Sequence, residues 1–88
     1  MDIYLPVLSD YEDPVEWITD VGLNCGVGLR ECREQGDQAG CEELLGHLRA
    51  SVEQAVELEI TESRPVQLLA RNTIDPQERL RLYSLAGC

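Results

Sequence analysis

The sequence contains no phenylalanine and no lysine, and aromatic residues make up only 5% of its 88 residues. The hydrophobic core must therefore be built mainly from leucine, valine, isoleucine and alanine. Apolar residues still amount to 43%, which is typical of a folded chain rather than a disordered one. All seven basic residues are arginine, which suits a GC-rich bacterial or phage genome. The length predicts one small domain over residues 1–88.

Long apolar runs are also missing. No window approaches the roughly 20 consecutive apolar residues that a membrane-spanning helix needs. The first residues, Met-Asp-Ile-Tyr-Leu-Pro, contain no basic residue and no long apolar stretch, so we expect no signal peptide. These absences predict a cytoplasmic protein that does not enter a membrane.

Acidic residues dominate what is present. Seventeen acidic residues against seven arginines give a formal charge of −10. This charge repels nucleic acid and anionic lipid, so direct binding to either is not expected. The acidic residues are concentrated in the first two thirds of the chain, and residues 1–29 contain no basic residue. A partner is therefore expected to be another protein with a basic surface.

Two dipeptides mark helix starts. Asp13-Pro14 and Asp75-Pro76 each place a capping carboxylate before a proline, whose missing N–H costs nothing in the first helical turn. The pattern predicts a first helix over residues 14–35, and Asp37 is expected to cap a second helix over 38–60. Pro65 is expected to end that segment. One or two short helices should complete the C-terminal part.

The two long helices have apolar stripes that match when the chain folds back between residues 36 and 37. Each apolar residue then meets an apolar partner, as an antiparallel helical hairpin requires. The expected facing pairs are Leu29 with Leu44, Cys25 with Leu48, Val21 with Val52, and Ile18 with Ala55. The sequence thus predicts a mainly α fold, formed by this hairpin and a short extended N-terminal arm.

An α+β alternative stays open. Residues 56–62 alternate between apolar and polar side chains, and so do residues 3–7, which is a strand pattern. A small two-stranded pairing of residues 2–8 with residues 56–62 would satisfy both segments, with Pro6 confining the first to a sheet edge.

No combination of residues indicates catalysis, so we expect a binding protein and not an enzyme. The favoured hypothesis is a small binding module or inhibitor that docks a carboxylate-rich helical face on a basic partner. Phage anti-defence proteins, including anti-CRISPR proteins, and antitoxins share this size and acidity, an analogy of composition alone. The face is expected to contain Glu12, Asp13, Glu16, Asp20, Glu42, Glu43, Glu53 and Glu57.

The alternative hypothesis is a non-catalytic structural subunit or homodimer. Leu23 and Val27 lie on the side of the first helix opposite its main stripe, and with Trp17 they could form an apolar contact surface. Packing of the C-terminal helices on this side would instead bury Leu23 and Val27 inside the domain. Gly22, Gly26 and Gly28 in the same helix indicate either a close helix approach or a kink.

The cysteines allow several interpretations. Cys32 and Cys41 are equally far from the predicted bend and could form a disulfide, although buried reduced thiols are the usual state in the cytoplasm. A zinc site of Cys25, Cys32, Cys41 and His47 can be written down, but it has no Cys-x-x-Cys pair. We therefore expect no metal and no cofactor.

Overall fold

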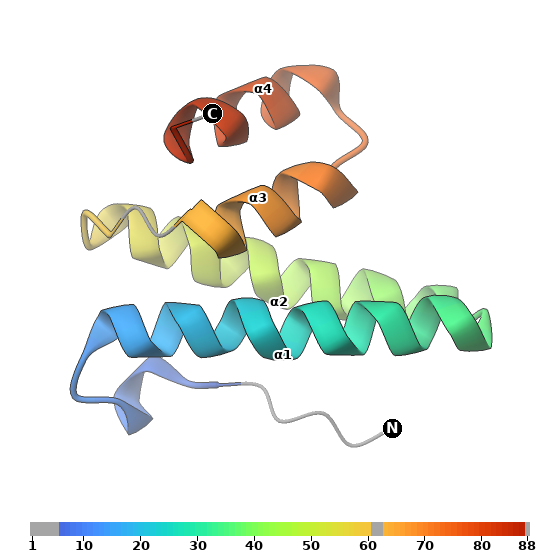
Figure 1. The fold of residues 1–88 in the computed structure, drawn as a ribbon, viewed down its shortest axis with the longest axis horizontal. Helices are drawn as coiled ribbons and strands as arrows, with labels where there is room; N and C mark the ends of the chain where they lie inside the picture. Colours follow the sequence, from blue (N-terminus) through green and yellow to red (C-terminus); the bar gives the residue numbers. More distant parts are fainter. Residues whose placement is uncertain (1–5, 61–62, 88) are drawn as a thin grey trace.

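The computed structural model describes residues 6–60 and 63–87. It contains a short 3-10 helix, η1 (Leu8–Asp10), followed by α1 (Pro14–Gln35), α2 (Gln38–Glu57), α3 (Ser63–Asn72) and α4 (Pro76–Leu85). The prediction of a mainly helical fold is confirmed. In Figure 1, α1 and α2 run side by side in opposite directions, and α3 and α4 lie along one flank of this pair.

The ends of α1 follow from local chemistry. The Asp13 carboxylate accepts a hydrogen bond of 3.0 Å from the Val15 N–H, and Pro14 occupies the first helical position. The helix ends at Gly36, whose φ of 72° is a left-handed conformation that glycine adopts without strain. The Asp37 N–H donates to the Cys32 carbonyl, which completes a Schellman motif.

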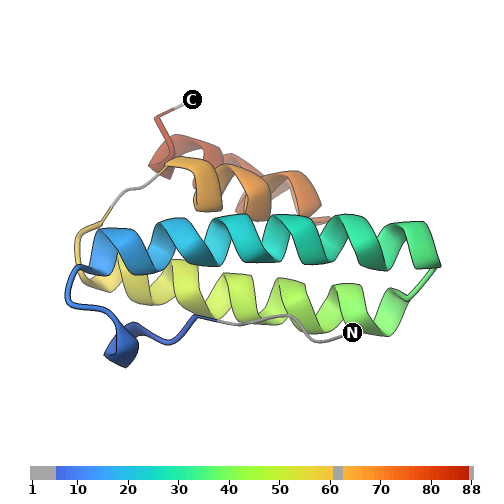
Figure 2. The same cartoon turned by 60° about the horizontal axis from the view of Figure 1, so that its bottom comes forward.

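The next helix starts directly from this turn. Asp37 accepts a hydrogen bond of 3.0 Å from the Gly40 N–H and thereby caps α2. Only Gly36 and Asp37 separate the two helices, so α1 and α2 pack along most of their length (Figure 2).

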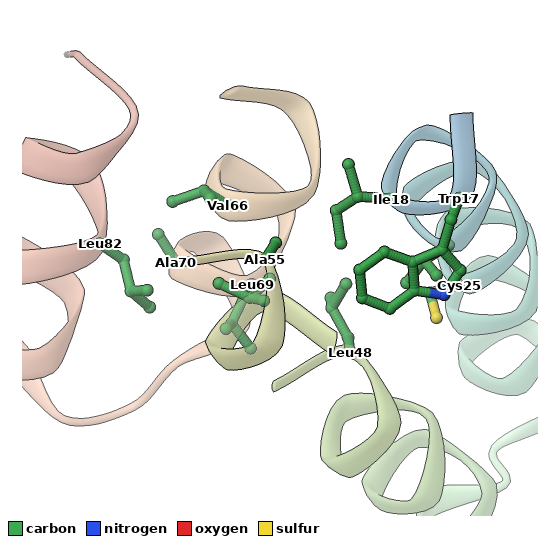
Figure 3. Close-up of a cluster of buried hydrophobic side chains, with 11 residues drawn as sticks. Trp17, Ile18, Cys25, Leu48, Ala55, Val66, Leu69, Ala70 and Leu82 are labelled. Atoms are coloured by element: carbon green, nitrogen blue, oxygen red, sulfur yellow. The ribbon is translucent and has the colours of Figure 1, made fainter. Parts of the chain in front are cut away.

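The core lies between α1, α2 and α3, and α4 adds Leu82 to it (Figure 3). Trp17 is its largest side chain and is only 2% exposed. A smaller second cluster near the bend joins Leu29, Cys32 and Leu44. All eight residues of the four expected facing pairs are buried, and the two members of each pair belong to the same cluster.

The expected end of the second helix was wrong. Helix α2 stops at Glu57, not at residue 60, because Glu59 turns into the left-handed region with φ of 61°. The Glu59 N–H donates to the Val56 carbonyl, and the Ile60 N–H donates to the Ala55 carbonyl. Ile60 packs against the core cluster that contains Ala55. This is again a Schellman motif, here with a glutamate where glycine is usual.

The strand alternative finds no support in the described part of the chain. Residues 56 and 57 are the last two of α2, residues 8–10 form η1, and no β-strand occurs within residues 6–60 and 63–87. The remaining parts of the alternative, residues 2–5 and 61–62, lie outside the described residues.

Pro65 begins a helix and does not end one. It lies in the first turn of α3, where its missing N–H removes no helical hydrogen bond. After α3, Asp75 caps α4 by accepting from the Gln77 N–H. Arg79 reaches back and donates through Nε and Nη2 to the Thr73 carbonyl, which fixes the loop between α3 and α4.

Candidate functional site

One end of the helical pair concentrates exposed carboxylates. Because α1 and α2 are antiparallel, the first turn of α1 lies beside the last turn of α2 (Figure 1). Five of the eight acidic residues expected in a docking face are exposed there, and we call this region the anionic end. They are Glu12, Asp13 and Glu16 at the start of α1, and Glu53 and Glu57 near the end of α2.

Two further acidic residues join the anionic end. Asp10 at the end of η1 and Glu59 in the turn after α2 are both exposed. Glu59 was not among the expected residues, because the second helix was predicted to continue through this position. The signal in the sequence that points to this turn is the alternating pattern of residues 56–62, which departs from helical periodicity.

The carboxylates of α1 and α2 differ in their electrostatic setting. Asp13 and Glu16 lie at a helix N-terminus, where the helix dipole favours negative charge. Glu57 and Glu59 lie at the C-terminus of α2, where the dipole disfavours negative charge, and no basic residue occupies the last turn of this helix. Within residues 6–60 and 63–87, the one ion pair joins Arg49 to Glu78, away from the anionic end.

The structure does not bring all eight expected acidic residues together. Glu42 and Glu43 lie near the bend. Glu42 is 15 residues before Glu57, so the two are about 22 Å apart along the axis of α2. Asp20 lies one turn inward from Glu16 and accepts a hydrogen bond of 2.8 Å from the Tyr11 hydroxyl. The expected single acidic face is therefore not formed. Asp20 and the neighbouring residues Glu42 and Glu43 lie apart from the anionic end.

Of the three residues expected in an apolar contact surface, only Leu23 and Val27 are exposed. Leu23 and Val27 are 54% and 57% exposed, so α3 does not cover them. Trp17 is buried in the core, and its indole Nε1 donates to the Pro6 carbonyl at 3.3 Å. The prediction that Trp17 belongs to a contact surface was therefore wrong, because residues 6–11 fold over it. Helical periodicity does not indicate such a contact with the chain before the helix.

A groove between α1 and α3 lies beside Leu23 and Val27. Its volume is about 430 Å³, and Gly22 and Gly26 form part of its wall. A Cβ atom on Gly22 would lie 3.0 Å from Pro65 Cγ, which identifies close helix approach as the role of this glycine. Three exposed arginines also line the groove: Arg30 of α1, and Arg64 and Arg71 of α3. They were not predicted to lie together because Arg30 is far from the other two in the sequence.

The cysteines near the bend form no disulfide. Cys25, Cys32 and Cys41 are all free thiols, so the possible Cys32–Cys41 disulfide is not formed. Burial raises the pKa of the Cys25 thiol to about 11. Burial also raises the pKa of Cys32, with further contributions from the neighbouring Cys41 thiol and the Asp37 carboxylate. These shifts favour the protonated form and make both thiols poor nucleophiles.

The described side chains form no cluster suited to a metal ion. Among residues 6–60 and 63–87, no three His, Cys, Asp or Glu side chains are grouped to hold a metal ion. His47 is partly buried and its Nε2 has no hydrogen-bond partner in the described part of the chain. It lines a small pocket with Trp17 and Ser51 and not with any cysteine.

No known protein family, curated protein or solved structure matches this chain. Among the helices that the structure describes, none has the length and apolar content needed to cross a membrane. The function is therefore inferred from the geometry of the chain itself.

Proposed function

We propose that the protein is a small, non-catalytic binding module that docks its anionic end on a basic surface of a partner protein. The carboxylates of Glu57 and Glu59 support this most directly. Negative charge at a helix C-terminus costs about 0.3–1 kcal/mol per residue at an exposed site. Fold stability does not account for acidic residues at these two positions, whereas binding to a cationic partner does.

The unpaired state of the anionic end also supports the proposal. None of its described carboxylates forms an ion pair with a described arginine, so their field is directed to the solvent. A field of this kind accelerates encounter with a basic surface and favours that surface over acidic ones. A basic site that normally holds nucleic acid would be a suitable target, as for the inhibitors with which this chain shares its size and acidity. The free thiols agree with action in a reducing compartment such as the cytoplasm.

Charge-matched variants test the proposal. Glu53→Lys with Glu57→Lys changes the anionic end, and Glu42→Lys with Glu43→Lys makes the same change in net charge near the bend. Each protein is used as bait in a bacterial lysate, and captured proteins are eluted with increasing salt and identified. We expect wild type and the bend variant to retain a partner that the anionic-end variant loses, and salt to release it. Equal loss in both variants, or retention at high salt, would contradict the proposal.

The exposure of Leu23 and Val27 favours a second candidate function, a structural subunit or homodimer that uses this apolar face. Two neighbouring aliphatic side chains that are each more than half exposed form the centre of such a contact. This candidate does not require the anionic end, and the two functions can coexist.

A further inference from the structure

The outward face of α1 has a pattern that is complementary to itself. Asp20, Leu23, Val27 and Arg30 follow one another at intervals of three, four and three residues, which places them along one side of the helix. Leu23, Val27 and Arg30 are exposed, and Asp20 is partly exposed. The order along this stripe is acidic, apolar, apolar, basic, so reversing the direction exchanges acid for base and leaves the apolar centre unchanged.

We propose that a second copy of this chain covers this face, with α1 packed antiparallel against α1 of the other copy. This inference rests on the second candidate function and specifies its geometry. The twofold axis passes close to residue 25, near the middle of the helix. Leu23 of each copy then faces Val27 of the other, and Asp20 faces Arg30, so each contact occurs twice.

The charges select the antiparallel arrangement. A parallel pair of α1 helices would place Asp20 against Asp20 and Arg30 against Arg30, and like charges in contact are unfavourable. In the antiparallel register, both pairs become attractive. An apolar partner without this order of charges would not form these two pairs. Charge complementarity therefore favours a second copy of the chain in the antiparallel register.

The groove beside the stripe provides a second cation for the contact. Gly22 and Gly26 line the groove, and their missing side chains let Pro65 and Leu68 of α3 lie close to α1. Helix α3 runs in the same direction as α1, since Pro65 lies at Gly22 and Leu68 lies at Gly26. Arg71, which lines the same groove, is one turn beyond Leu68 toward the level of Arg30. The Asp20 carboxylate of the other copy would thus meet both Arg30 and Arg71.

Two repulsive terms oppose this dimer and set its salt dependence. Glu16 would face Glu34 of the other copy at each end of the contact, and each chain has a net charge of −10. Salt screens the long-range repulsion between the two chains, so dimerisation should be retained or strengthened as ionic strength rises. Docking of the anionic end on a basic partner should weaken under the same change, which separates the two proposals.

Charge exchange between Asp20 and Arg30 tests the register. Asp20→Arg and Arg30→Asp each turn two attractive pairs into repulsive ones, and we expect each to weaken dimerisation about tenfold in analytical ultracentrifugation. Mixing the two variants should restore association as a heterodimer, and the double variant should dimerise more strongly than either single variant but less strongly than wild type, because Arg71 would still face the new arginine. Arg81→Asp on α4 makes the same change in net charge as Arg30→Asp outside the contact, and it should weaken the dimer much less. Circular dichroism of each variant verifies that it is folded.

A gain of affinity provides a second, independent test. Glu34→Arg would convert the two Glu16–Glu34 repulsions into attractions and should tighten the dimer at least threefold. Glu43→Arg makes the same charge change on α2, outside the contact, and measures the effect of net charge alone. Leu23→Asp should abolish the dimer, whereas Leu80→Asp, at a 70% exposed leucine of α4, should not.

Three results would overturn the inference. A wild-type chain that stays monomeric at every concentration, in low and in high salt, excludes the dimer. A dimer that survives Leu23→Asp uses another surface. A dimer that Leu23→Asp abolishes but that the paired charge exchange does not restore has a different register. None of these results affects the anionic-end proposal, whose test uses Glu53 and Glu57 of α2, and loss of that binding would leave the dimer intact.

Discussion

Gly22 of α1 lies so close to Pro65 of α3 that an added Cβ atom would be 3.0 Å from the proline Cγ and 3.5 Å from its Cα. The proline ring is closed onto its own backbone nitrogen and cannot rotate away. Gly22→Ala is therefore expected to destabilise the protein by about 1–3 kcal/mol, despite the better helix propensity of alanine.

Gly46 of α2 is the matched control, because no atom lies within 4 Å of a Cβ built there. Gly46→Ala should stabilise the fold by about 1 kcal/mol in urea unfolding. If the two substitutions had the same sign, the close contact between α1 and α3 would be contradicted.

The left-handed turn at Glu59 predicts a stabilising substitution. Its φ of 61° costs a non-glycine residue about 1–2 kcal/mol, and glycine adopts it without that penalty. Glu59→Gly should therefore raise the free energy of unfolding by about 1 kcal/mol, whereas Glu57→Gly, at the last helical position of α2, removes the same charge without relieving a left-handed conformation and should not raise it. The test is the urea midpoint of each variant. A destabilised Glu59→Gly protein would mean that the turn is formed differently.

Burial of Trp17 predicts a role in stability rather than at a surface. Trp17→Ala removes the largest side chain of the core and a hydrogen bond to the Pro6 carbonyl, so it should cost about 3–5 kcal/mol and leave the chain largely unfolded at room temperature. Tryptophan fluorescence of wild type should be blue-shifted and poorly quenched by iodide. Efficient quenching in the folded state would instead place Trp17 on the surface.

Cys25 predicts a loss of stability at alkaline pH. Its pKa is about 11 in the folded chain and near 9 when unfolded, so between these values the folded state holds more protons. The contribution is complete below pH 9 and is lost as the pH rises toward 11. Urea unfolding across this range should show a steeper decline for wild type than for Cys25→Ala. Identical slopes would show that the thiol does not titrate differently on folding.

Much of the fold could be predicted because its signals are local. Asp13-Pro14, Gly36-Asp37 and Asp75-Pro76 determine helix ends through hydrogen bonds to residues at most five positions away. The core stripe of α1 was predictable because a helix repeats its faces at a fixed interval.

The missed features depend on residues far apart in the sequence or on unusual backbone geometry. Trp17 is buried by residues 6–11, and the arginine-lined groove exists because α3 packs on Gly22 of α1. The end of α2 was misplaced because Glu59 adopts a conformation usually reserved for glycine. The acidic residues expected on one docking face do not form one surface, because antiparallel packing places Glu42 and Glu43 at the opposite end of the helical pair from Glu53 and Glu57.

Helix α4 is attached mainly to α3, and Leu82 is its one fully buried residue within the described chain. Its ten residues therefore depend on few core contacts, and α3 anchors them to the two long helices. Such a segment opens at a lower free energy than the whole fold, so its amide hydrogens should exchange with solvent well before those of α1 and α2. The protein would then retain its helical pair while its C-terminal helix repeatedly detaches and rebinds.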